Sequence, residues 1–89
     1  MKIYKATKSH LHFKKGDYVV LISSEVVPTH TNFTNNSKKS ISVKVDIFNK
    51  NRKKYDGFKH DINPTKLKEM MDCLELSSLQ KEDLYVDGS

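Results

Sequence analysis

The chain has 89 residues, of which 36% are apolar and none is tryptophan. This length accommodates one hydrophobic core, so we expect a single domain over residues 1–89. The lone cysteine, Cys73, cannot form an internal disulfide, which excludes a disulfide-stapled secreted scaffold and favours a cytoplasmic protein. No apolar stretch approaches the ~20 residues that a transmembrane helix requires, so no membrane partner is expected.

Charge is distributed unevenly along the chain. Residues 1–68 contain fifteen Lys or Arg and five Asp or Glu, a balance of +10. Residues 69–89 contain one Lys and six acids, a balance of −5, which leaves the net charge of +5. This asymmetry favours anionic partners for the basic part and cationic partners for the acidic end.

The first half of the chain predicts strands. Residues 2–7 alternate well enough for a short strand, and Lys15-Gly16-Asp17 indicates a turn. Residues 18–22 are β-branched and aromatic, apolar on both faces, and typical of a central strand that residues 25–27 can extend. The polar residues 28–39 allow two interpretations, an edge strand at 29–33 with a hairpin turn at 35–37, or a loop.

Two more strands and a helix are predicted in the second half. Residues 41–47 alternate apolar and polar side chains, and after a turn at 49–51 a strand returns over residues 53–58, with Tyr55 and Phe58 facing in. Asn63 is a good N-cap and Pro64 a good first helical residue. The apolar spacing then predicts a helix from about 64 to 75, followed by a short strand or tail at 83–89.

Strands followed by a helix predict an α+β protein, with a small, twisted, mostly antiparallel sheet and one C-terminal helix packed on it. The expected core is Val20, Ile22, Val43, Val45, Leu67, Met70, Met71 and Leu74. The segment Phe-Lys-Lys-Gly-Asp-Tyr-Val-Val-Leu at residues 13–21 is similar to the opening strand of SH3-like barrels. That resemblance implies a partial barrel and carries no function.

A partner-binding surface is predicted from the cations. The densest cluster lies at residues 50–55, two Lys pairs lie elsewhere, and one further Lys projects from the solvent face of a strand. Because Arg52 is the single arginine, these cations should act as point charges on phosphate rather than read bases. A merely solvated surface is the alternative. The predicted binding residues are Lys14, Lys15, Lys38, Lys39, Lys44, Lys50, Arg52, Lys53, Lys54 and Tyr55.

The histidines and the cysteine do not predict a cofactor. His10 and His12 would share a strand face and, with His30 or His60 and Asp61, could surround a metal, but this spacing fixes no geometry. We therefore predict neither metal nor cofactor, and expect exposed histidines to tune the basic face near neutral pH. Cys73 lies next to the apolar stripe of the helix and between acids, which indicates a structural role.

These features predict a small, basic, intracellular, non-enzymatic protein that engages nucleic acid through a Lys-rich face. The alternative is a protein–protein inhibitor or adaptor of phage or mobile-element type, which would meet a nucleic-acid-handling enzyme or an acidic protein surface. A toxin-like ribonuclease is a third hypothesis, with His60 and Asp61 as acid and base and with Arg52 and Tyr55 near the anion. Low apolar content and open sheet edges at 29–33 and 84–86 would favour a homodimer.

Overall fold

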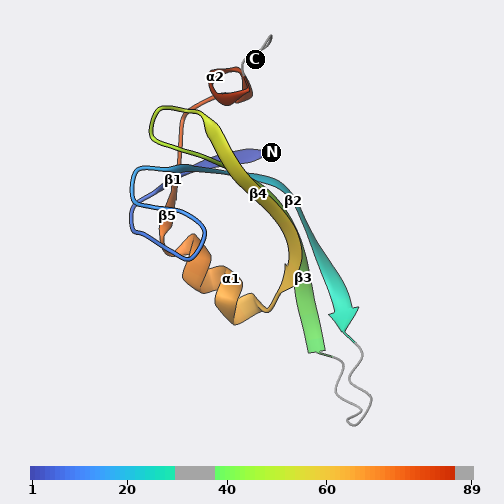
Figure 1. The fold of residues 1–89 in the computed structure, drawn as a ribbon. Coiled ribbons are helices and arrows are strands. Elements are labelled where there is room, and N and C mark those ends of the chain that lie inside the picture. The colour runs from blue at the N-terminus through green and yellow to red at the C-terminus, as the bar shows by residue number, and fades with distance from the viewer. Residues whose placement is uncertain (30–37, 86–89) are drawn as a thin grey trace.

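The computed structural model describes the backbone of residues 1–29 and 38–85, and the side chains of these ranges except 27–29 and 38–39 (Figure 1). The predicted hairpin turn at 35–37 and nearly all of the alternative edge strand at 29–33 lie outside the described residues. Within the described ranges, no helix is long and apolar enough to cross a membrane.

The architecture is a five-stranded sheet in which every described pairing is antiparallel. Its order is β4-β3-β2-β1-β5, so the strand beginning at Tyr18 takes the predicted central position. The strands are β1 (Lys2–Ala6), β2 (Tyr18–Thr29), β3 (Lys38–Phe48), β4 (Lys54–Ile62) and β5 (Leu74–Leu76). The coarse α+β prediction agrees with this sheet and its accompanying helices.

Two helices with a strand between them replace the single predicted helix. Helix α1 (Pro64–Met71) begins where predicted, because the Asn63 side chain accepts a hydrogen bond from the Lys66 N–H at 2.7 Å. It ends before the predicted residue 75, since Leu74–Leu76 pairs with β1 as β5. Helix α2 (Lys81–Leu84) occupies the start of the predicted strand or tail, and residues 86–89 lie outside the described ranges.

The core is divided between the two faces of the sheet. Successive strand residues point to opposite faces, so Val19 joins the cluster beneath α1 and Val20 joins the cluster beneath α2. This explains the doubly apolar pattern at the start of β2. In Figure 1, α1 lies on the concave side of the curved β2–β3–β4 sheet.

Half of the predicted core is fully buried. These residues are Val20, Val43, Val45 and Met70. The other four are only partly buried. Leu67 and Met71 lie on the short helix α1, Ile22 lies at a bulge in β2, and Leu74 lies in the edge strand β5.

Candidate functional site

Strand register brings two of the predicted cation groups to one end of the sheet. Tyr18, which opens β2, pairs with Phe48, and Phe48 pairs with Lys54 at the start of β4. The residues just before β2 and the β3–β4 turn therefore emerge at the same sheet end. We call their six cations the sheet-end cluster; they are Lys14, Lys15, Lys50, Arg52, Lys53 and Lys54.

The β3–β4 turn is fixed by Asn49. Its side-chain Oδ1 accepts hydrogen bonds from the N–H groups of Asn51 and Lys53 at 2.9 and 3.1 Å, and its carbonyl accepts from the Arg52 N–H at 2.8 Å. Arg52 has a φ of +66°, in the left-handed region that arginine seldom adopts. These bonds fix the backbone of the predicted turn, from which its cationic side chains extend into solvent.

Tyr55 links the turn at residues 14–17 to β4. Asp17, which is only 7% exposed, accepts hydrogen bonds from the Lys14 N–H at 2.9 Å and from the Tyr55 hydroxyl. That hydroxyl also lies 3.3 Å from the His12 carbonyl oxygen. Burial of the hydroxyl, and then its bond to Asp17, raises the pKa of Tyr55 above its ordinary value. The turn that bears Lys14 and Lys15 is therefore bonded to β4, the strand that begins at Lys54.

Tyr55 does not face into the core as predicted. Its side chain is 48% exposed, because it sits at an irregularity in the pairing between β3 and β4 and reaches sideways to Asp17. Only Phe58 of the predicted inward pair packs partly against the core beneath α1. The exposed Tyr55 ring lies beside the cations instead.

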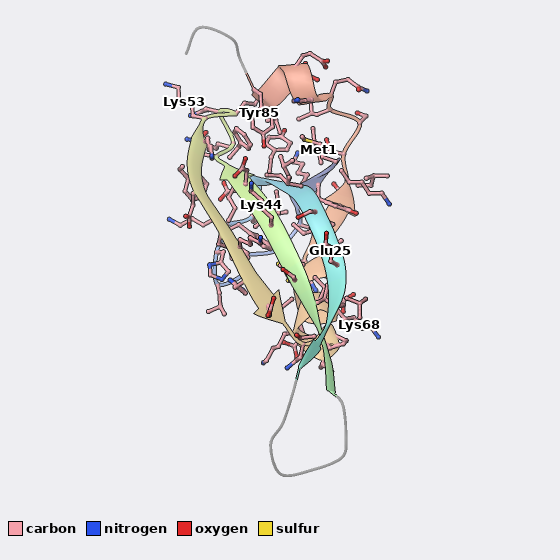
Figure 2. The ribbon with its side chains drawn as sticks, turned by 90° about the vertical axis from the view of Figure 1, so that its right-hand side faces the viewer. Met1, Glu25, Lys44, Lys53, Lys68 and Tyr85 are labelled. Carbon is pink, nitrogen blue, oxygen red and sulfur yellow. The ribbon has the colours of Figure 1, made fainter. Side chains whose placement is uncertain are left out.

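The remaining predicted cations lie elsewhere. Lys44 is exposed on the sheet face away from α1, where it pairs with Ser23 on one side and Lys59 on the other (Figure 2). Lys38 and Lys39 pair with residues 28–29 at the opposite end of the long β2–β3 ladder, and their side chains are not described. The ten predicted residues therefore do not form one continuous face.

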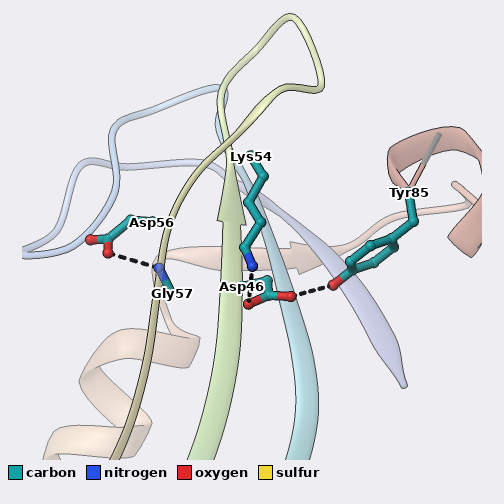
Figure 3. A network of polar contacts seen from close by, with 5 residues as sticks. All are labelled: Asp46, Lys54, Asp56, Gly57 and Tyr85. Atoms are coloured by element: carbon teal, nitrogen blue, oxygen red, sulfur yellow. Dashed lines mark hydrogen bonds and ion pairs between the residues drawn. The ribbon is translucent and has the colours of Figure 1, made fainter. Parts of the chain in front are cut away.

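Asp46 neutralises one member of the sheet-end cluster. Its carboxylate lies 3.4 Å from the Lys54 ammonium and accepts a hydrogen bond from the Tyr85 hydroxyl at 2.7 Å (Figure 3). Burial, and then the bond to Asp46, raises the pKa of Tyr85 above its ordinary value. Gly57 leaves room for this carboxylate, since a Cβ there would lie 2.7 Å from Asp46 Oδ1. Lys54 is therefore less available to a partner than its neighbours along the turn.

A cavity of about 200 Å³ lies on the other side of β4, between that strand, α1 and residues 10–12. Phe58 forms its aromatic centre: the His60 ring stacks on it at 4.5 Å with a 15° interplanar angle, and the His12 ring lies 4.4 Å away. Lys66 and Glu69 of α1, paired at 3.5 Å, add polar groups to its lining. The cavity thus combines aromatic rings and the apolar side chains of Leu11, Ile62 and Met70 with one ion pair.

The structure assembles the predicted histidine groups only in part. His12 and His60 come within 5.9 Å, measured between ring centroids. Asp61 pairs with Ser42 and therefore projects to the opposite face from His60, so the acid–base pair of the ribonuclease hypothesis is split. No group of three or more His, Cys, Asp or Glu among the described residues is placed to hold a metal, and His30 lies outside them.

Sequence reasoning missed the contacts that organise this site. Tyr55 and Asp17 are separated by 38 residues, and Tyr85 and Asp46 by 39. No local pattern signals such pairs.

Cys73 is half-buried, and its thiol donates to the Glu69 carbonyl at 3.4 Å, which agrees with the structural role that was expected.

Comparison with protein-family models, with curated proteins and with solved structures finds no match to this chain.

Proposed function

We propose that this protein binds nucleic acid through the sheet-end cluster and does not catalyse a reaction. The observation that supports the proposal is the fastening of two lysine-bearing turns at one sheet end by the bond from Tyr55 to Asp17. Turns whose backbone is already fixed lose less conformational freedom when their lysines meet a phosphate backbone. A cytoplasmic location and an SH3-like partial barrel belong to the same proposal.

The local charge balance suits a polyanion. Within the described residues, Lys54 is the one member of the cluster that forms an ion pair, so five cations face solvent without a carboxylate partner. Asp17, the carboxylate within the turn at 14–17, is buried and already accepts two hydrogen bonds, and Asp56 is the exposed carboxylate next to Tyr55. Lysine ammonium groups attract phosphates as point charges and release condensed counterions when they bind.

The test is charge reversal at the β3–β4 turn. The variant Lys50→Glu/Arg52→Glu/Lys53→Glu should abolish binding of a random oligonucleotide in fluorescence anisotropy and should keep its melting temperature, since all three side chains are exposed. Wild-type affinity should fall with salt at a log–log slope of about −3.5 for five contacts to a single strand.

A matched control distinguishes the loss of the sheet-end cluster from a general effect of lower net charge. The variant Lys44→Glu/Lys59→Glu/Lys68→Glu changes charge by the same amount at exposed positions outside the cluster. It should lower affinity far less than the turn variant. Equal losses in the two variants would show that only overall charge matters, and would contradict a defined site.

A protein partner is the second candidate, and the short edge strand β5 favours it. Leu76 is 69% exposed there and follows the exposed Glu75. An edge strand offers unpaired backbone groups to another chain, including a second copy of this one. No oligonucleotide binding at ~100 mM salt, where charges are screened beyond ~10 Å, would favour this candidate. The open edge predicted at 84–86 is not a strand where it is described, since Leu84 is buried in α2 and Tyr85 is the C-cap of that helix.

A further inference from the structure

We propose that the cavity beside β4 receives one unpaired base, so that the nucleic acid bound by this protein is single-stranded. This inference rests on the proposed function and names its substrate class. It uses residues that the sheet-end cluster does not include.

The ring geometry carries the argument. The Phe58 and His60 rings stack on each other at 4.5 Å, and the tilted His12 ring lies 4.4 Å from Phe58 at one side of the same cavity, so the aromatic surface left open to a ligand is chiefly that of the exposed His60. Flat side chains of this kind are the usual stacking platforms for bases that have left a duplex. His60 is exposed and Phe58 is only partly buried, so part of this aromatic surface is available to a ligand.

Size and polarity narrow the ligand further. The volume of about 200 Å³ is smaller than a drug-sized pocket and suits a single ring system. Lys66 and Glu69 supply a donor and an acceptor for the polar edge of such a ring. His10 also lines the cavity, and its buried Nδ1 finds no hydrogen-bond partner among the described residues. Leu11, Ile62 and Met70 complete the lining, so the cavity suits a flat ring with apolar faces and polar edges, which is the character of a base.

The cavity is close enough to the cations to share one strand with them. The Tyr55 hydroxyl, at the sheet-end cluster, lies 3.3 Å from the carbonyl oxygen of His12, whose ring lines the cavity. Phe58 follows Tyr55 by three residues in β4, which corresponds to about 10 Å along an extended strand. One short oligonucleotide can therefore place phosphates on the turns and a base on the exposed His60 ring, which Phe58 supports from beneath. A duplex cannot do this, because its base faces are stacked inside.

The experiment compares single-stranded dA12 with a blunt 12-base-pair duplex by fluorescence anisotropy. Wild type should bind the single strand more tightly. Phe58→Leu should weaken single-strand binding by up to about 150-fold, because it removes the ring on which His60 stacks and with it the platform for the base, and should leave duplex binding unchanged. Tyr4→Leu is the matched control, because it removes a partly buried ring outside the cavity lining.

His60 provides a pair of variants that does not endanger folding, because its side chain is exposed. His60→Ser should weaken binding of dA12, whereas His60→Phe, which keeps a flat ring, should retain it. In wild-type protein, dA12 should also move the ring-proton resonances of Phe58 and His60 upfield in NMR spectra. This measurement needs no substitution.

The outcomes separate the two proposals. If Phe58 and His60 resonances stay in place, or the duplex binds as tightly as dA12, the base-binding cavity is wrong. The sheet-end cluster then stands if charge reversal at the turn still abolishes binding. If wild type binds neither probe at moderate salt, the proposed function fails and the cavity inference fails with it.

Discussion

Two tyrosine–carboxylate bridges fasten this molecule, and they have opposite effects on its cations. Tyr55 binds Asp17 and holds the turn at residues 14–17 beside β4. Tyr85 binds Asp46 and holds the end of α2 against β3. Asp46 also pairs with Lys54, whereas Asp17 takes its second bond from a backbone N–H. The Tyr55–Asp17 bridge thus leaves the charges of Lys14 and Lys15 available, whereas the carboxylate of the Tyr85–Asp46 bridge neutralises Lys54.

The largest expected effect is the loss of either carboxylate. Asp17→Ala and Asp46→Ala should each lower the free energy of unfolding by about 2–4 kcal/mol, since each leaves the partners of a largely buried carboxylate without an acceptor. Chemical denaturation measures this. Only Asp17→Ala should also weaken oligonucleotide binding, because it releases the turn that bears Lys14 and Lys15. Equal binding by both variants would contradict the functional difference between the bridges.

A smaller loss is expected at Gly57. Its Cβ in Gly57→Ala would lie 2.7 Å from Asp46 Oδ1 and 3.2 Å from the Val45 carbonyl oxygen. The variant should lose about 1–3 kcal/mol of stability, because overpacking forces the Asp46 carboxylate and the strand to shift. Thermal melting followed by circular dichroism checks this. If combining it with Asp46→Ala gives strictly additive losses, the two side chains do not interact.

The Asn63 cap provides a reference that touches neither bridge. Asn63→Ala should lower stability by about 1 kcal/mol, because the Lys66 N–H at the start of α1 loses its acceptor. Affinity for the 12-base-pair duplex, which uses the sheet-end cluster and not α1, should not change. A loss of duplex affinity in this variant would mean that α1 influences the sheet-end cluster.

The smallest effect concerns alkaline pH. The raised pKa values of Tyr55 and Tyr85 mean that the folded state keeps phenolic protons that the unfolded state loses near pH 10. Their contribution to stability is therefore full below about pH 10 and is lost as pH rises further. In an absorbance titration, Tyr55→Phe and Tyr85→Phe should each remove one late-ionising group. An ordinary titration of all tyrosines would contradict both bridges.

The strands could be predicted because their patterns are local. Alternation in residues 41–47 and the doubly apolar start at residues 18–22 reflect which faces are covered, and the structure has strands at both places. The Asn63 cap was readable for the same reason, since the cap and its partner are three residues apart.

The end of the chain was mispredicted where local signals were ambiguous. Leu74 continues the helical spacing from Leu67, yet it also alternates with Leu76. In the structure it belongs to a strand, because residues 74–76 pair with β1. The capping pair of α2 is Gln80 with Asp83, whose carboxylate accepts from the Gln80 N–H at 2.7 Å. The tyrosine bridges and the ring cluster of the cavity join distant segments, so no sequence pattern could reveal them.

The pairing of β1 with β5 has a consequence for how the protein is made. Residues 4–6 can complete their backbone pairing only after residues 74–76 have been synthesised. When β1 to β4 have left the ribosome and β5 has not, β1 is therefore an edge strand whose backbone groups lack a partner on one side. Joining such distant segments slows folding. During that interval the nascent chain is most exposed to wrong pairing with its neighbours on the same messenger RNA.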